Sequence, residues 1–296
     1  MDLISIERKY RNTRNIIVFL LFVLICTIIT LAFFEIKKHI VLDELYNSFN
    51  KQGKILEEKA IEVEKMRLEK EREMRLPKFT EEAQNNMANL YHSENKRVFL
   101  TFDDGPSQTV TIPILDLLKK ENIKATFFVL GNRVELNPEI LKREYAEGHF
   151  IASHGYSHVY SQIYETPQSV LDEYNKSVEA IRNAIGEPTY NPHLFRFPGG
   201  YFGGKYASIK QEALQILEQN EIFHVDWNAL TADAAGNSTT EQFIAEIDKT
   251  AVKHNSVVLL MHDAGTKTAT AEALPEIIKY FRDRNYEFKN FYDIFN

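Results

Sequence analysis

Cysteine is nearly absent from this sequence, in which Cys26 is the only one among 296 residues. An intramolecular disulfide is therefore impossible, and a metal cluster held by several thiolates is excluded. Any metal ion must be held by histidines and carboxylates. Basic residues are not in excess either, because 35 Lys and Arg stand against 42 Asp and Glu, for a formal net charge of -7. This balance argues against a basic groove that binds nucleic acid.

Phosphate-binding loops are also missing, since neither GxGxxG nor GxxxxGK[ST] occurs. Hydride transfer from a dinucleotide and P-loop chemistry are therefore poorly supported. Proline is absent before Pro77, which is compatible with a long N-terminal helix. Hydrophobic residues make up 44% of the chain and aromatic residues 12%. A composition of this kind can build a sizeable core and excludes wholesale disorder.

Residues 16–34 form an uncharged run of 19 residues. As a helix the run would span about 28 Å, close to the ~30 Å hydrocarbon core of a bilayer. Arg8, Lys9, Arg11 and Arg14 precede it, which favours a cytoplasmic tail at 1–15 and an extracellular remainder. The alternative is a cleaved signal peptide, but its apolar region usually has only about 7–15 residues, and no small-x-small cleavage site follows here. We therefore expect a single-pass anchor in the cell membrane.

Residues 35–96 are polar and charged and are predicted to form a helical stalk followed by a polar linker at 85–96. The segment 57–75 mixes both signs of charge and is rich in strong helix formers. A heptad pattern can be drawn through Leu42, Leu45 and Phe49, but polar residues such as Lys59 and Lys70 interrupt it. Two interpretations stay open, a solvated single helix that acts as a spacer and a weak self-association through a coiled coil.

Residues 97–296 alternate short apolar strands with amphipathic helices. Strands are predicted at 98–102, 125–130, 150–153, 194–197, 222–227 and 256–261. Helices are predicted at about 110–121, 138–147, 168–185, 206–219, 240–254 and 271–284. Regular alternation of this kind indicates an α/β domain with a parallel sheet, either doubly wound or closed as a barrel. Catalytic groups in such sheets lie at the carboxyl ends of the strands, and the unusual polar clusters occur there.

The first two clusters could together bind a metal ion. Asp103 and Asp104 follow a strand, and adjacent carboxylates repel unless a cation offsets one of them, although Gly105 and Pro106 would also suit a plain turn. His154 and His158 leave another strand and would share one face of a helix. Taken without the other clusters, the pair is better interpreted as two surface histidines that bind nothing. Combined with Asp104 they make a two-histidine, one-carboxylate set with open coordination positions.

Three further clusters lie in the second half of the domain. Arg196 leaves an apolar strand just before Gly199 and Gly200 and could orient a carboxylate or form a structural salt bridge. Trp227, the only tryptophan, could be a core residue. His262 ends an apolar strand, where a paired core histidine is the usual explanation.

In their order and placement these clusters resemble the motifs of the NodB-like polysaccharide deacetylases, carbohydrate esterase family four. The matching segments are TFDDG at 101–105, HxxxH at 154–158, RxPxG at 196–200 and LLMHD at 259–263. The resemblance covers the whole globular part and implies a distorted (β/α) barrel. It implies metal ligation by Asp104, His154 and His158 to one divalent ion, usually zinc.

The same resemblance implies roles for the remaining polar residues. Asp103 would be the general base and Arg196 would orient it, while His262 would be the general acid that protonates the departing amine. A backbone N–H near Gly199 would help to stabilise the oxyanion, and Trp227 is a candidate for substrate contact.

The sequence departs from the family pattern at several positions. Gly155 stands where a Ser or Thr is frequent, and Gly199 replaces a frequent Tyr, which should widen that wall of the site. A further family motif, often DxxDW, would align with LTADA at 230–234, where Leu230 takes the place of the first Asp, which orients the acid histidine. We expect Asp233 to substitute for it.

The leading hypothesis is a metal-dependent N-deacetylase of cell-surface polysaccharide, most simply the N-acetylglucosamine of peptidoglycan. Chitin-like oligomers, poly-N-acetylglucosamine and O-acetylated xylan are alternatives, because the motifs report the acyl chemistry and not the glycan. A rival of another class is a catalytically weak glycan-binding or scaffolding protein, in which the altered motif at 230–234 has cost activity. An amidohydrolase of small amides on the same fold is a further rival.

Overall fold

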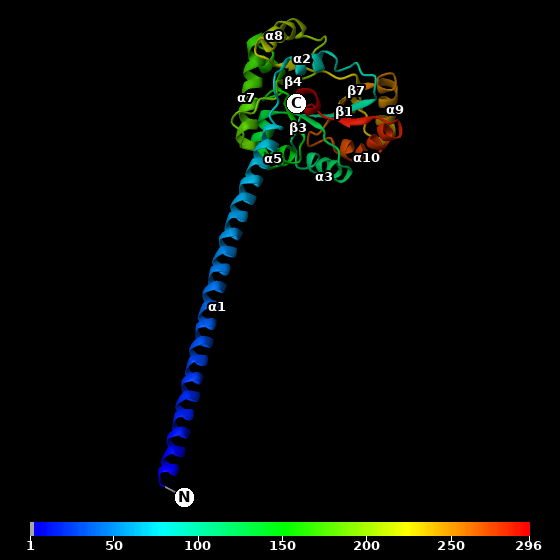
Figure 1. The fold of residues 1–296 in the computed structure, drawn as a ribbon. Coiled ribbons are helices and arrows are strands. Elements are labelled where there is room, and N and C mark those ends of the chain that lie inside the picture. The colour runs from blue at the N-terminus through cyan, green and yellow to red at the C-terminus, as the bar shows by residue number, and fades with distance from the viewer. Residues whose placement is uncertain (1–2) are drawn as a thin grey trace. The chain divides into compact units, whose positions relative to one another are not determined.

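The structure is a computed structural model that describes residues 3–296, with side chains described from residue 11 onward. The chain divides into two compact units, and the boundary lies between Lys70 and Glu71. Helix α1, Leu3–Glu73, makes up nearly all of the first unit and is unbroken from the apolar run into the charged segment (Figure 1). At 1.5 Å per residue it is about 107 Å long.

The apolar part of α1 is exposed to the surroundings along its whole length. Every side chain from residue 16 to residue 34 is exposed. By length and composition the helix can cross a membrane, a property that it shares with signal sequences. The helix ends at Glu73, four residues before Pro77.

The second unit is built on one curled parallel sheet that forms a half-barrel. Its strand order is β5-β4-β3-β2-β1-β7-β6, and β8 pairs with the first half of β1. The strands are β1 Arg97–Asp103, β2 Thr126–Val129, β3 Phe150–Ser153, β4 Leu194–Phe195, β5 Phe223–His224, β6 Ala229–Leu230, β7 Ser256–His262 and β8 Glu287–Lys289. The parallel sheet and the barrel type predicted from the sequence are therefore confirmed, and β6 and β8 are additional strands.

Helices surround the strands of this unit (Figure 1). The long ones are α3 Thr111–Glu121, α5 Pro138–Ala146, α7 Pro167–Ile185, α8 Ala207–Gln219, α9 Thr240–Ala251 and α10 Thr268–Asp283. They agree with the six predicted helices within a few residues. Shorter helices that the sequence analysis did not predict are α2 Glu81–Ala88, α4 Gly131–Leu136, α6 Tyr160–Ile163, α11 Tyr292–Phe295 and a 3₁₀ turn at Asp233–Ala235.

Strand β1 shows how the sheet faces two environments. Val98, Leu100 and Phe102 belong to the core between the sheet and the outer helices. Alternate residues of a strand point to opposite faces, and Phe99 belongs to a separate apolar cluster with α2 and α11. Asp103 shares the face of Phe99, so its carboxylate lies on the inner side of the half-barrel.

The predicted polar linker is partly a packed element of the globular unit. Thr80 caps α2 by accepting a hydrogen bond from the Ala83 N–H. Ala83 and Leu90 are both almost fully buried, in the cluster that contains Phe291. The second compact unit therefore begins at Glu71 and includes α2 in addition to residues 97–296.

Candidate metal centre and catalytic pocket

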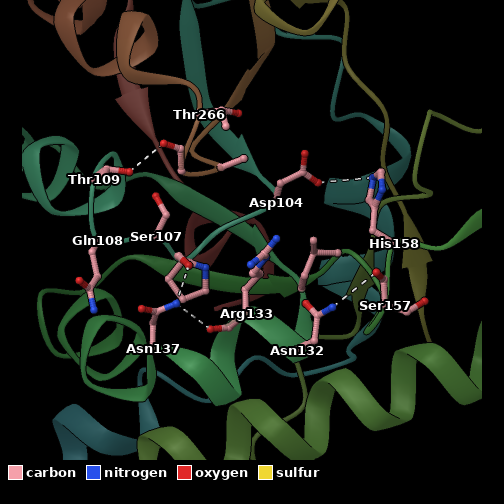
Figure 2. A pocket seen from close by; sticks show the side chains of 14 residues that line it. Asp104, Ser107, Gln108, Thr109, Asn132, Arg133, Asn137, Ser157, His158 and Thr266 are labelled. Carbon is pink, nitrogen blue, oxygen red and sulfur yellow. Dashed lines mark hydrogen bonds and ion pairs between the residues drawn. The ribbon is translucent and has the colours of Figure 1, made fainter.

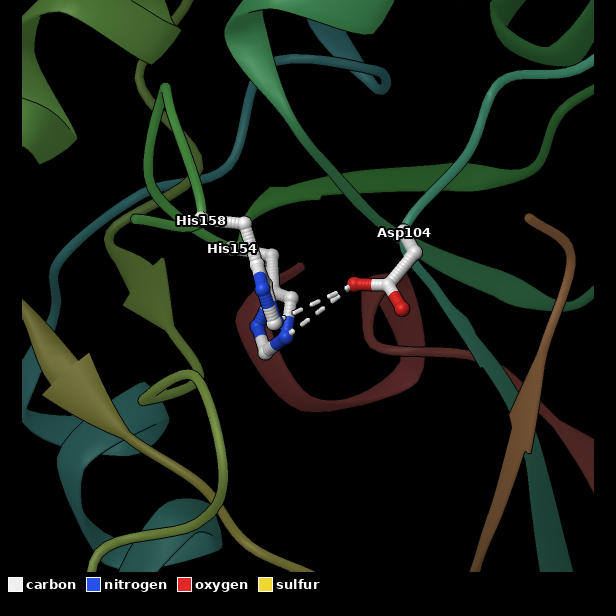
Figure 3. Close-up of side chains that lie close together, drawn as sticks. All are labelled: Asp104, His154 and His158. Atoms are coloured by element: carbon white, nitrogen blue, oxygen red, sulfur yellow. Dashed lines mark ion pairs between the residues drawn. The ribbon is translucent and has the colours of Figure 1, made fainter. Parts of the chain in front are cut away.

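Three potential metal ligands meet at the carboxyl ends of β1 and β3. Asp104 follows β1, whereas His154 and His158 follow β3, and their ligand atoms all lie within 4.8 Å of one another. Both imidazoles face one carboxylate oxygen of Asp104 (Figure 3): its Oδ1 lies 3.6 Å from His154 Nε2 and 3.5 Å from His158 Nε2. The segment 154–158 is a loop and not a helix, so its fold, rather than helical spacing, brings the two rings together.

The chemistry of this triad fits a divalent cation. Asp104 Oδ1 is buried and has no hydrogen-bond partner among the described residues, a costly state unless a cation lies beside it. Burial lowers the pKa of His154 to about 3, so its imidazole is neutral at pH 7, as a metal ligand must be. His154 Nδ1 lies 2.8 Å from the carbonyl oxygen of Arg196, and this contact leaves Nε2 to face Asp104.

Backbone geometry and one carboxylate hold the histidine loop in place. Asp104 and His158 have positive φ angles of 76° and 57°, which are uncommon for residues other than glycine. Gly155 has φ +86°, a region that favours glycine. The Glu173 Oε2 atom on α7 accepts hydrogen bonds of 2.7 Å from the N–H groups of Tyr156 and Ser157. The Glu173 carboxylate therefore holds the loop in place, although Gly155 has no hydroxyl of the kind that a Ser or Thr at this position would supply.

Asp103 lies beside the triad and is paired with a buried arginine. Arg196 Nη1 donates to Asp103 Oδ1 at 2.8 Å, and neither side chain is more than 2% exposed. The guanidinium also donates to the Thr101 hydroxyl and to the carbonyl oxygens of Val225 and Asp226. Burial raises the pKa of Asp103, while the charge and hydrogen bond of Arg196 oppose this effect. Asp103 is therefore a carboxylate of raised basicity with a fixed orientation.

His262 ends β7 in register with Asp103 on the neighbouring strand β1. The imidazole Nδ1 of His262 lies 2.8 Å from Asp233 Oδ1, and the backbone N–H of His262 donates to Asp233 Oδ2. Burial lowers the pKa of His262, but the hydrogen bond and charge of Asp233, together with nearby Asp103 and Asp104, outweigh it and raise the pKa to about 9. Asp233 is therefore placed to fix the orientation of the His262 imidazole, whereas the Leu230 side chain has no polar group that could do so.

One cavity of about 400 Å³ is lined by the triad, by Asp103, His262 and Asp233, and by Gly199 and Trp227. The sequence had suggested that Gly199 would widen the wall of this cavity, but the structure shows no such widening. A Cβ atom built on Gly199 would lie 2.5 Å from the hydroxyl oxygen of Tyr160, which therefore fills that space. Gly199 has φ +75°, and its N–H donates to no other described residue. Trp227 forms a further wall, 5.9 Å from the Arg196 guanidinium.

Sequence reasoning missed three residues that shape this site. Tyr160 and Glu173 act through contacts between the histidine loop and other elements, for which the sequence carries no local signal. Lys267 lines the cavity, and its Nζ donates to the carbonyl oxygen of Asp233 at 2.9 Å. Its place five residues after His262 could have drawn attention to it.

Comparison with known proteins agrees with this fold and site. The family model described as polysaccharide deacetylase matches residues 91–222. A peptidoglycan-N-acetylglucosamine deacetylase of Bacillus cereus is 31% identical over 205 residues, which cover 68% of this chain and 71% of that protein. The chain belongs to the polysaccharide deacetylase family.

Two further relatives define the extent of the similarity. The peptidoglycan-N-acetylglucosamine deacetylase PgdA of Listeria monocytogenes is 34% identical over 198 residues, 66% of this chain but only 38% of that longer protein. A solved structure of a Streptococcus mutans CE4 esterase superposes with a TM-score of 0.63 at 32% identity, covering 70% of this chain and 90% of that chain. The similarity thus concerns the globular unit.

Proposed function

We propose that the globular unit is a metal-dependent N-deacetylase of cell-wall polysaccharide, with the N-acetylglucosamine of peptidoglycan as its substrate. One observation carries the proposal: Asp103, which is paired with Arg196, and His262, which is paired with Asp233, end the neighbouring strands β1 and β7 beside the triad and line the same cavity as the triad. Hydrolysis of an amide needs a base for the water and an acid for the leaving amine. The relatives named as peptidoglycan-N-acetylglucosamine deacetylases support the choice of sugar.

Asp104, His154 and His158 would hold the cation, and zinc suits two imidazoles and one carboxylate. When bound, the ion supplies a Lewis acid that polarises a carbonyl oxygen and acidifies a nearby water. Asp103 takes the proton of the attacking water, and Arg196 holds its carboxylate in position. The Gly199 N–H is available to donate a hydrogen bond to the developing oxyanion.

His262 completes the reaction by giving its proton to the amine nitrogen as the carbon–nitrogen bond breaks. Without this proton the leaving group would be an amide anion, which is too basic to depart. Asp233 keeps the imidazole charged and oriented before the proton is transferred. The raised pKa of His262, about 9, means that the acid is protonated across the neutral range.

We further propose that residues 16–34 anchor the protein in the cell membrane with residues 1–15 in the cytoplasm and the catalytic unit outside. The basic residues before the apolar run support this orientation. The exposed apolar surface of α1 supports insertion into lipid. An extracellular catalytic unit on a charged spacer would be suited to a cell-wall substrate.

The proposal is tested by measuring acetate release from N-acetylglucosamine oligomers and from peptidoglycan fragments, using residues 71–296. We expect release with metal, loss of release with a chelator, and recovery when Zn²⁺ is added back. Co²⁺ and Mn²⁺ added in parallel would test the preference for zinc. Acetate release that is indifferent to the chelator would contradict the mechanism.

Replacing Asp233 with asparagine should move the alkaline limb of the kcat–pH profile to lower pH by at least about one unit. The acid His262 must be protonated, so activity falls as the pH rises through its pKa. Burial of His262 persists in this variant, whereas the hydrogen bond and charge that raise the pKa are lost. Asp248→Asn, on the surface helix α9, is the matched control and should keep the normal profile. An unchanged alkaline limb in Asp233→Asn would show that Asp233 does not tune the histidine.

A further inference from the structure

A second cavity, of about 430 Å³, shares part of its lining with the catalytic cavity. Asp104 and His158 line both cavities, so a chain-like substrate that lies over the triad can extend from one into the other. The second cavity is lined by the segments that follow β1, β2, β3 and β7. Its side chains are mostly polar and include Ser107, Asn132, Arg133 and Asn137 (Figure 2).

Arg133 is the only lysine or arginine that lines this second cavity, which we call the Arg133 pocket. Its guanidinium lies among the polar side chains and points to the side on which Asp104 lies (Figure 2). The backbone carbonyl of Arg133 accepts a hydrogen bond from Asn137 Nδ2. Within the described residues its guanidinium has neither a hydrogen bond nor an ion pair. An unpaired guanidinium at the wall of a polar cavity is suited to an anion from outside the protein.

The carboxylates near Arg133 are engaged elsewhere. Asp104 is the single Asp or Glu that lines the pocket, and its carboxylate faces the two histidines of the triad. Glu135, two residues along α4, accepts a hydrogen bond from the Tyr156 hydroxyl at 2.8 Å. Further capacity for a polar ligand comes from Asn132, whose Oδ1 is buried without a hydrogen-bond partner among the described residues, and from the exposed Gln108.

We propose that the Arg133 pocket binds a carboxylate carried by the sugar next to the one that is deacetylated. This inference rests on the proposed function and specifies its substrate further. The planar guanidinium can donate two parallel N–H hydrogen bonds to the two oxygens of a carboxylate, a bidentate geometry that hydroxyl groups of a neutral glycan do not provide. The substrate class is therefore a polymer in which an N-acetylated sugar alternates with an acidic one, which in peptidoglycan means strands whose lactyl carboxylates are free of peptide. A homopolymer of N-acetylglucosamine would leave the pocket without its ionic contact.

The test compares three glycans. One is a peptidoglycan strand with its peptides removed, so that every second sugar has a free lactyl carboxylate. The second is the same strand with these carboxylates converted to methyl esters, and the third is an oligomer of N-acetylglucosamine. Wild type should give a higher kcat/KM on the acidic strand than on the methyl ester. The ratio of kcat/KM on the acidic strand to kcat/KM on the methyl ester should fall about fivefold in Arg133→Gln, the effect of losing an exposed ion pair.

Lys142→Gln on α5 removes the same charge outside the pocket and should keep the wild-type ratio. The preference should also weaken in 0.5 M salt, because an exposed ion pair is screened. An equal effect of Arg133→Gln on all three glycans, or no effect, would overturn the assignment of the pocket. No acetate from any glycan would instead overturn the proposed function. In that case the affinities of wild type and Arg133→Gln for the acidic strand and its methyl ester, measured by calorimetry, still decide whether the pocket selects carboxylates.

Discussion

Arg196→Met is expected to lower the free energy of unfolding by about 3–5 kcal/mol, the cost of removing one partner of a buried ion pair. The Arg196 side chain is fully buried and donates to Asp103, Thr101 and two backbone carbonyls. Methionine would fill much of the volume, but the Asp103 carboxylate would stay buried without a cation. Urea unfolding at pH 7 measures the loss, and the general base would lose its orientation at the same time.

Two further variants make this prediction specific. Arg143→Met removes a partly exposed arginine that pairs with Asp116 and Glu147, and it should cost at most about 1 kcal/mol. Adding Asp103→Leu to Arg196→Met removes the orphaned charge and should recover part of the stability without restoring activity. A loss below about 1 kcal/mol in Arg196→Met, or a double variant less stable than the single one, would contradict this account of the pair.

Asp104→Asn is expected to weaken metal binding strongly and to lower acetate release at least about 10²–10³-fold, since Lewis-acid stabilisation depends on the bound ion. The carboxylate supplies the only negative charge of the triad, and both imidazoles face its Oδ1 atom. Calorimetric titration with Zn²⁺ measures the affinity, and activity is measured at saturating metal.

Asp116→Asn is the control for this substitution, because Asp116 is an exposed carboxylate on α3 that pairs with Arg143. It should bind zinc and release acetate as wild type does. If Asp104→Asn kept the zinc affinity of the wild type, the three residues would not be the ligands, and the site would have to be sought elsewhere.

The sequence allowed most of the sheet to be predicted, because β1, β2, β3 and β7 are apolar runs bounded by turn residues. Strand β6 consists of only Ala229 and Leu230, too short for any periodic signal. Helix α2 is mostly polar, and Ala83 is its only fully buried residue. Short elements of this kind form because of tertiary contacts, and the local pattern of apolar and polar residues in the sequence does not reveal such contacts.

The candidate site could be predicted as a set of residues but not as an arrangement. The motifs name Asp103, Asp104 and His262, and the parallel strands bring their ends to one edge. Because Leu230 stands in place of the usual Asp, the sequence predicts Asp233 as the partner of His262, and in the structure the 3₁₀ turn that carries Asp233 brings its carboxylate to 2.8 Å from the imidazole. The hydroxyl of Tyr160 beside Gly199 comes from a different loop, so only the folded chain brings them together.

The most direct test of the central claim is mass spectrometry of peptidoglycan glycan strands treated with metal-loaded residues 71–296. We expect a loss of about 42 Da per acetyl group removed, as metal-assisted hydrolysis of the amide requires, and fragmentation should place each loss on N-acetylglucosamine. Strands that keep their full mass, although the protein has bound one metal ion, would contradict the proposed activity.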